Sequence, residues 1–440
     1  MNKYMNKYTK RACLFVMLSM CCLLWGCHKM DGPALSGPDV SESQKALIQA
    51  ESPPKVHLKL TYSGKDIVWI SKIEEIVASF TTLYPSIEIE MDPGREGVYM
   101  EYLKASKALN DFPDIMEIEE PLSFVKSGKI GIIPDDASGL VNDPLTYNSR
   151  IFALPMYSTT YGMIYNTEMF DRYQLTPPKD YQQFLDLCET LKKKGIAPIG
   201  IAGDDMRYWN YWINYYFIKD VLCKIPDWQY LRGLKKASFA DECAAGMLKD
   251  FKLLFDKGYI DENFIELTEN QLATSFVQGD IAMLYAGPML FSQIQNTDAD
   301  MSFSWFFLPD EQGNVMAAKD TKSYWALSKE CTRDQQKAEA ASLFLQYFYQ
   351  TENYRKILIS INAIPTTRQT VLYPSIEVQQ DLLVNYRYAE KFSSLIGSLD
   401  TPETFNNAMS LIVKDYVLDM VSLEDTAVLL DSAWDKARVY

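Results

Sequence analysis

The sequence has few of the residues on which hydrolytic and metal chemistry most often depend. Its 440 residues include only two histidines, His28 and His57. A serine-hydrolase triad and a zinc-hydrolase site both require histidine, and the sequence has no G-x-S-x-G turn, H-E-x-x-H helix or phosphate-binding P-loop. We therefore expect no catalytic residues, no metal site and no cofactor. A carboxylate pair for glycoside hydrolysis stays open as an alternative, because the 58 acidic residues offer many pairs.

Cysteine is scarce outside the N-terminal segment, and the chain has no C-x-x-C pair of the kind that binds zinc. Half of the eight cysteines lie within the first 27 residues. The other four are far apart in the sequence: Cys188, Cys223, Cys243 and Cys331. Cys188 falls on the apolar stripe of an expected helix, which favours a buried thiol. A secreted protein could join Cys223 to Cys243, but the sequence does not establish a disulfide.

The N-terminal segment has the features of a secretory signal. Four basic residues precede an apolar run at 12–25, and this run is shorter than the about 20 residues that cross a bilayer. The run ends in Leu24-Trp25-Gly26-Cys27, which resembles a bacterial lipobox although Trp25 is bulky for its position. The resemblance implies a signal peptide over residues 1–26, lipid on Cys27, and anchoring outside the cytoplasm at the bacterial cell membrane. The alternative is an uncleaved signal anchor with incidental cysteines.

The charge of the chain excludes some partners. The formal net charge is −15, and loss of the basic N-terminal segment would lower it to −19. So acidic a surface argues against nucleic acid and against docking on anionic lipid through a basic patch. Residues 28–55 are rich in glycine, proline and serine, so we expect 27–55 to be a lipidated cysteine followed by a flexible tether.

Alternating apolar residues mark the start of the ordered part. Val56, Leu58 and Leu60 predict a strand. Residues 70–80 then carry apolar side chains at helical spacing, and 87–91 alternate again, which predicts a β-α-β unit with parallel strands. Strands and helices continue to alternate along the chain, so we expect an α/β fold.

Six segments stand in order along the chain. They are Phe80-x-x-x-Tyr84-Pro85-x-Ile87-x-Ile89, Phe112-Pro113-Asp114-Ile115, Leu154-Pro155 with Gly162-Met163-Ile164-Tyr165-Asn166, the helix from Pro177 to Gly195 followed by Ile196-Ala197-Pro198-Ile199, Phe276-x-x-Gly279-Asp280-Ile281-Ala282-Met283, and Gly287-Pro288. In this order they resemble motifs of the carbohydrate-type extracellular solute-binding proteins, the maltose-binding-protein-like family 1. The chain departs from the family at Met289, where tryptophan often follows Gly-Pro, so one stacking platform is missing or moved.

The resemblance implies a periplasmic-binding-protein-like, or Venus flytrap, fold with two lobes joined by hinge crossings. It places lobe 1 at 56–158 plus 310–365, and lobe 2 at 159–309 plus 366–440. It also implies that the protein is no enzyme but a monomeric lipoprotein. Such a protein captures a carbohydrate, most simply an oligosaccharide, and delivers it to the transmembrane permease of an ABC importer.

Candidate ligand-binding residues are those that follow strand ends or lie at the crossings, because open α/β sheets bind ligands there. Sugars need flat rings and hydrogen-bonding side chains. The candidates are Tyr62, Ser63, Glu117, Glu119, Tyr157, Thr159, Trp209, Asn210, Trp212, Tyr324 and Trp325. For any one aromatic residue, core packing is the competing interpretation. Trp209 stands out because polar residues precede it in an expected cleft loop.

Two other functions stay open. The same fold could bind a non-sugar solute, such as iron through tyrosines or an anion through basic side chains. Alternatively, the chain could be a surface glycosidase or an adhesin-like lipoprotein. Saturable binding without turnover would distinguish a binding protein from an enzyme.

Overall fold

The computed structural model describes residues 55–437 except 65–66, 95–98, 107–111, 120, 261–262, 264, 370, 372, 374–375, 394, 396–400 and 403. The predicted signal peptide, Cys27 and all but the last residue of the tether therefore lie outside the described residues. Within the described part of the chain, no helix is long and apolar enough to cross a membrane.

The first sheet contains the β-α-β unit expected from the sequence. Strand β1 (Val56–Ser63) pairs in parallel with β2 (Ile87–Gly94), and α2 (Ile67–Leu83) connects them. The sheet has the order β2-β1-β3-β11-β5-β4, with β3 (Ile115–Ile118), β4 (Leu145–Tyr147), β5 (Arg150–Thr159) and β11 (Asp320–Leu327). Strand β11 runs antiparallel to both β3 and β5, so the sheet is mixed.

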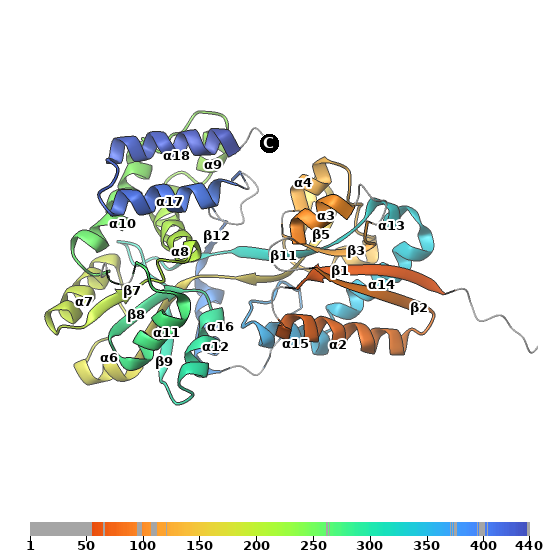
Figure 1. Ribbon diagram of the computed structural model, residues 1–440, viewed down its shortest axis with the longest axis horizontal. Helices are drawn as coiled ribbons and strands as arrows, with labels where there is room; N and C mark the ends of the chain where they lie inside the picture. The colour runs from red at the N-terminus through yellow and green to blue at the C-terminus, as the bar shows by residue number, and fades with distance from the viewer. Residues whose placement is uncertain are drawn as a thin grey trace, which may run out of the picture. The chain divides into compact units, whose positions relative to one another are not determined.

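Helices cover both faces of this sheet. On one face lie α2, α14 (Gln335–Phe348) and α15 (Thr351–Ser360), and on the other α3 (Tyr99–Ser106) and α4 (Pro121–Lys126) (Figure 1). Two separate apolar clusters follow from the alternation of side chains along each strand. On β11, Trp325 and Leu327 pack into the first cluster and Ala326 packs into the second. The short helices α5 (Asp135–Ser138) and α13 (Lys329–Arg333) complete this part.

A second sheet has the order β7-β8-β6-β9. Its strands are β6 (Gly162–Asn166), β7 (Ala197–Gly200), β8 (Ile281–Ala286) and β9 (Phe303–Phe306). The surrounding helices are α6 (Thr167–Tyr173), α7 (Tyr181–Lys193), α8 (Met206–Phe217), the π-helix η2 (Ile218–Leu222), α9 (Trp228–Gly233), α10 (Glu242–Asp256), α11 (Glu269–Gln278), α12 (Met289–Thr297), α16 (Glu377–Tyr388), α17 (Phe405–Val417) and α18 (Leu423–Ala437). Together they bury the largest apolar cluster.

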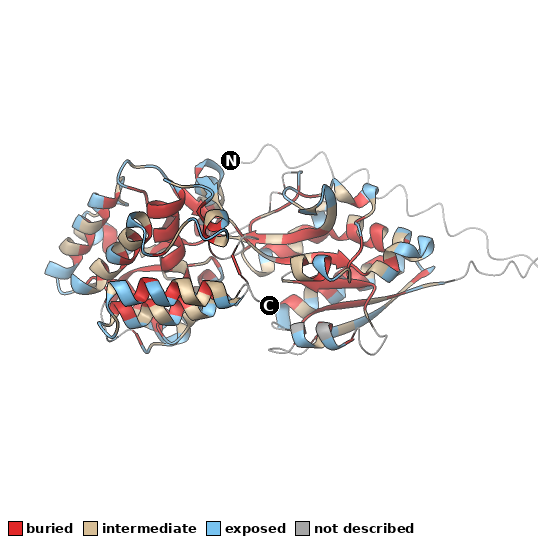
Figure 2. Cartoon of the chain, turned by 90° about the horizontal axis from the view of Figure 1, so that it is seen from above, coloured by how far each residue is buried: buried red, intermediate tan, exposed pale blue. Residues whose placement is uncertain are grey.

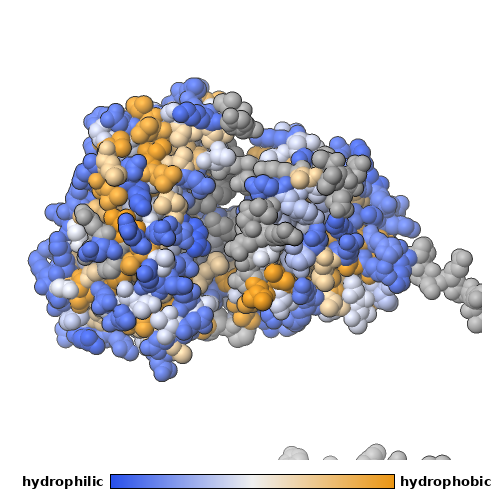
Figure 3. All heavy atoms as spheres, in the orientation of Figure 1, coloured by the Kyte–Doolittle hydropathy of each residue, from blue (hydrophilic) through white to orange (hydrophobic). Residues whose placement is uncertain are grey.

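The outer faces of these helices are largely polar. Figure 2 shows buried residues along the strands and the inner sides of the helices, with exposed residues outside. Hydrophilic residues cover most of the face in Figure 3, whereas hydrophobic residues gather over α17 and α18. The exposed large apolar side chains of these two helices are Leu411, Val428 and Leu429.

The chain passes three times between the two sheets. Residues 160–161 join β5 to β6, residues 307–319 lead from β9 to β11, and residues 361–376 join α15 to α16. The first and third passages are tied together, because Ser158 N donates to Ile364 O at 3.0 Å and Ile364 N donates to Ser158 O at 2.8 Å. In the second passage, β10 (Met316–Ala318) pairs with β12 (Glu390–Phe392) and packs into the largest cluster.

Candidate functional site

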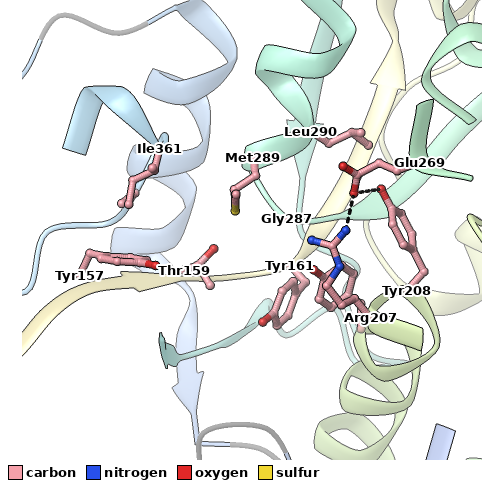
Figure 4. A pocket seen from close by; sticks show the side chains of 12 residues that line it. Tyr157, Thr159, Tyr161, Arg207, Tyr208, Glu269, Gly287, Met289, Leu290 and Ile361 are labelled. Atoms are coloured by element: carbon pink, nitrogen blue, oxygen red, sulfur yellow. Dashed lines mark hydrogen bonds and ion pairs between the residues drawn. The ribbon is translucent and has the colours of Figure 1, made fainter. Parts of the chain in front are cut away.

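A pocket of about 590 Å³ lies beside these passages (Figure 4). Tyr157 and Thr159 reach it from β5, and Ile361 and Ala363 from the segment after α15. The opposite wall consists of residues from α8, the start of α11 and the start of α12. The full lining is Tyr157, Thr159, Tyr161, Arg207, Tyr208, Tyr211, Glu269, Gly287, Met289, Leu290, Ile361 and Ala363. Elements packed on both sheets therefore contribute to one pocket.

Two tyrosine rings form the aromatic part of the pocket. Tyr161 and Tyr211 stack with ring centroids 4.0 Å apart and an interplanar angle of 20°. The hydroxyl of Tyr161 donates to the Asp320 carboxylate at the start of β11. Burial, followed by the charge of Asp320, raises the pKa of Tyr161 well above its usual value, so the phenol stays a donor. The stacked pair is thus tied to two of the three passages.

A charged group lies at the other end of the pocket. The Arg207 guanidinium donates to Glu269 at 3.3 Å, and the Tyr208 hydroxyl donates to the same carboxylate oxygen at 3.0 Å (Figure 4). Arg207 also donates through Nε to Asp205 at 2.8 Å. Burial and the charge of Glu269 raise the pKa of Tyr208. The Arg207 side chain is 55% exposed, and its hydrogen bonds to described residues leave from Nε and Nη2, so Nη1 has N–H groups available to a ligand.

Three apolar side chains, Met289, Leu290 and Ile361, complete the lining. Met289 is 59% exposed at the first position of α12 and points into the pocket in Figure 4. A methionine this exposed is not part of the core. Its flexible side chain can adapt to the shape of a bound ligand. The position at which the sequence lacks the expected tryptophan thus lies in this pocket.

Only two of the predicted site residues, Tyr157 and Thr159, line the pocket. Tyr62 and Ser63 at the end of β1 and Glu117 on β3 are buried, and the Glu117 carboxylate accepts from Ser63 N at 2.9 Å and from Trp69 Nε1 at 3.1 Å. Their side chains hold β1, β3 and α2 together instead of presenting a surface to solvent. Glu119 and Tyr324 are half-buried and lie outside the pocket lining.

The expectation for Trp209 requires correction. Residues 208–212 belong to helix α8, whose N-terminus is capped by the Asp205 carboxylate, and not to a loop. Trp209 is completely buried, donates from Nε1 to Gly203 O at 3.0 Å and stacks on Phe255 at 5.8 Å. Its ring has no free face for a sugar.

Asn210, Trp212 and Trp325 are also interior residues. Trp212 and Trp325 have no exposed surface, and each packs against other aromatic rings. Asn210 is 8% exposed and accepts a hydrogen bond from Ser410 at 2.7 Å. We therefore assign all three to packing, which corrects the prediction that they contact ligand.

Helical spacing in the aromatic run could have separated pocket residues from core residues. Positions 209, 212, 213 and 216 recur at three- and four-residue intervals, and all are buried. Positions 208 and 211, beside 207, form the adjacent stripe that lines the pocket. Glu269 and Ile361 carried no comparable pattern, because the fold alone brings them to the pocket.

Away from the pocket, a cluster of three acidic side chains surrounds the ammonium of Lys219. Asp220, Asp250 and Glu311 place carboxylate oxygens within 4.8 Å of one another. The fully buried ammonium of Lys219 lies among them, with contacts of 2.7, 2.8 and 2.7 Å. It also lies 4.6 Å from the ring centroid of Tyr181. The cluster is therefore an ion-pair network.

Cys188, Cys223, Cys243 and Cys331 are all free thiols in this structure.

Comparisons with known proteins agree with this architecture. The family model described as bacterial extracellular solute-binding protein matches residues 68–355, more than half of the chain. The structure resembles a chitin oligosaccharide binding protein with a TM-score of 0.73 and 21% identity, over 88% of this chain and 100% of that one. It also resembles RafE in complex with raffinose, with a TM-score of 0.69 and 19% identity, over 87% of this chain and all of that one. At such identities these likenesses establish the two-lobe α/β fold.

The curated relatives match over shorter stretches. The melibiose/raffinose/stachyose-binding protein MelE of Bacillus subtilis (strain 168) is 22% identical over 228 residues, which are 49% of this chain and 52% of that protein. Across the relatives, the matches cover from 12% to 59% of the relative's length. The family match and the fold agree, and the chain belongs to the bacterial extracellular solute-binding proteins, a family that works outside the cytoplasm.

Proposed function

We propose that this protein captures an oligosaccharide in the pocket beside the chain passages and delivers it, chemically unchanged, to the permease of an ABC importer. The observation that carries the proposal is the lining itself. The half-buried Tyr211 ring and the exposed Met289 side chain suit the C–H faces of sugar rings, and Arg207, Glu269 and Thr159 suit the hydroxyl groups.

The names of similar proteins support this ligand class. The relatives include a multiple sugar-binding protein and a diacetylchitobiose binding protein, and similar structures hold raffinose or stachyose. The permease partner follows from the ligand class, because a captured sugar outside the cytoplasm needs a route inward. We further propose that the protein acts as a monomer, held at the membrane through lipid on Cys27.

The two lobes proposed from the sequence are 56–158 plus 310–365, and 159–309 plus 366–440. The packing of β10 in the largest cluster supports a later start for the second segment of lobe 1, at Asp320. Because both lobes contribute to the pocket, a ligand that contacts both stabilises the arrangement in which they are close. Closure around the ligand would give the permease a ligand-dependent surface to recognise.

Calorimetric titration of the purified protein with raffinose, stachyose and chitin oligosaccharides tests the proposal. We expect saturable binding of at least one of these sugars, a raised melting temperature, and unchanged sugar after prolonged incubation. Shortened or transglycosylated products would contradict the proposal and favour an enzyme. Binding that is equally strong in an Arg207→Gln variant and a Tyr211→Ala variant would show that the ligand lies elsewhere.

A further inference from the structure

A second, more open pocket of about 960 Å³ lies on the other side of the chain passages. Successive side chains of a strand point to opposite faces. Tyr157 and Thr159 of β5 line the first pocket, and Ser158 between them lines the second. In the third passage, Ala363 lines the first pocket and Ile364 the second. The two pockets therefore share these strands as a common floor, one on each face.

The second pocket is basic, although the chain as a whole is acidic. Lys319, Arg368 and Lys391 line it together with one acidic residue, Asp143, whereas the formal net charge of the chain is −15. The Lys319 ammonium pairs with the Asp143 carboxylate. Among the residues that the structure describes, Arg368 and Lys391 form no ion pair with a carboxylate.

The contacts of these two basic groups leave donors available. Arg368 donates through Nε to Val141 O at 3.1 Å, and no described residue occupies its terminal N–H groups. Lys391 donates to Arg387 O at 2.9 Å and lies 5.3 Å from the ring centroid of Tyr386. Partial burial lowers the pKa of Lys391, as expected for a cation that loses water without gaining an anion. The pocket thus contains more positive charge than its own side chains neutralise.

The two unpaired cations belong to different parts of the fold. Arg368 follows Thr366 and Thr367, which accept hydrogen bonds from Asn142 N at 2.7 Å and Asn142 Nδ2 at 3.0 Å beside the first sheet. Lys391 lies on β12, which pairs with β10 and packs with the second sheet. A ligand that contacts both cations would therefore bridge the parts of the chain packed beside the two sheets, from the side opposite the first pocket.

We propose that this second pocket binds a small multivalent oxyanion, a phosphate or a polycarboxylate, between Arg368 and Lys391. A guanidinium takes either group in a two-pronged hydrogen bond, and an ammonium supplies a compact second charge. The site is distinct from the sugar pocket and does not depend on which sugar that pocket takes.

Calorimetric titration of the purified protein with pyrophosphate, citrate and inorganic phosphate, each at constant ionic strength, tests this site. We expect saturable one-to-one binding of pyrophosphate or citrate, and the tighter of the two identifies the phosphate or carboxylate class. Arg368→Gln and Lys391→Gln should each weaken binding about tenfold or more. Lys236→Gln removes an exposed lysine elsewhere in the fold and should leave binding unchanged.

Asp143→Asn should change the anion affinity in the opposite direction, because it removes the carboxylate that pairs with Lys319. Binding should tighten several-fold in this variant, a gain that misfolding does not produce. Absence of saturable binding by all three anions at millimolar concentration would overturn the proposal. So would binding that survives unchanged in the Arg368→Gln/Lys391→Gln double variant, since the anion would then be held elsewhere.

Discussion

Replacement of Lys219 by methionine tests how the largest core accommodates charge. The ammonium is fully buried and contacts carboxylates of Asp220, Asp250 and Glu311 at 2.7 to 2.8 Å. Burial alone would lower the pKa of Lys219, but the charge of Asp220 and hydrogen bonds to the three carboxylates raise it. Lys219→Met keeps most of the volume and leaves three carboxylates without their cation.

The magnitude depends on how well each carboxylate is hydrated. Breaking a buried ion pair by removing one partner costs about 3–5 kcal/mol. Glu311 is 49% exposed and Asp250 36% exposed, so water can replace the ammonium at both. Asp220 is only 6% exposed and has a buried oxygen without a hydrogen-bond partner. We therefore expect a loss near the lower limit, about 3 kcal/mol at pH 8.

The loss should shrink at low pH. Burial raises the pKa of Asp220 from 3.8 to about 6. A carboxyl group whose folded pKa exceeds its unfolded value contributes stability that is full below the unfolded pKa and is lost as the pH rises through the folded pKa. Without the ammonium, the folded pKa of Asp220 rises further. Lys219→Met should therefore lose much less stability at pH 5 than at pH 8.

Urea unfolding at the two pH values measures both effects, with the exposed Lys236→Met as the matched control. The double variant Lys219→Met/Asp220→Asn should recover most of the loss at pH 8, because no uncompensated buried charge remains. An equal loss at pH 5 and pH 8, or a double variant as unstable as the single one, would refute the reasoning.

Four further outcomes are expected. Arg207→Gln should weaken oligosaccharide binding by about 1.5–3 kcal/mol in titration calorimetry, with an unchanged melting temperature because the Arg207 side chain is 55% exposed. Trp209→Ala should lower the free energy of unfolding by about 3–5 kcal/mol through cavity formation, and affinity in the folded fraction should stay constant; a loss of affinity alone would return Trp209 to the site. Cys27→Ser should abolish lipid incorporation, and palmitate labelling that persists in this variant would exclude the lipobox. Pyrophosphate at saturation should raise the apparent Kd for sugar, and an unchanged Kd would show that the two pockets are independent.

The strands and helices of the first lobe could be predicted because their periodicities are local. Alternation at Val56, Leu58 and Leu60 gives β1, whose pairing with β2 is parallel as expected. The antiparallel insertion of β11 between β3 and β5 could not be predicted from periodicity. Strand β11 follows β3 by about 200 residues, and nothing in its own sequence specifies its neighbours.

The site was harder to predict, since aromatic side chains serve both the core and the pocket. Trp209 and Tyr208 are adjacent in sequence and equally buried, yet only Tyr208 lines the pocket. Because Tyr208 and Trp209 are consecutive residues of helix α8, they lie on different sides of it, one lining the pocket and the other packing in the core. Had residues 208–212 been assigned to a helix, the stripe through 209 and 212 would have indicated the core, and Tyr211 would have been the better candidate.

The position of the passages explains why two pockets with different chemistry can affect each other. Ser158 and Ile364 hydrogen-bond to each other within the shared floor. If the lobes close on a sugar by rotating about this floor, as proposed above, a rotation that narrows the pocket containing Tyr211 would widen the one containing Arg368 and Lys391. A sugar and a bridging anion would then favour opposite rotations, and each would weaken the other by the same factor, because coupling between two binding equilibria is reciprocal.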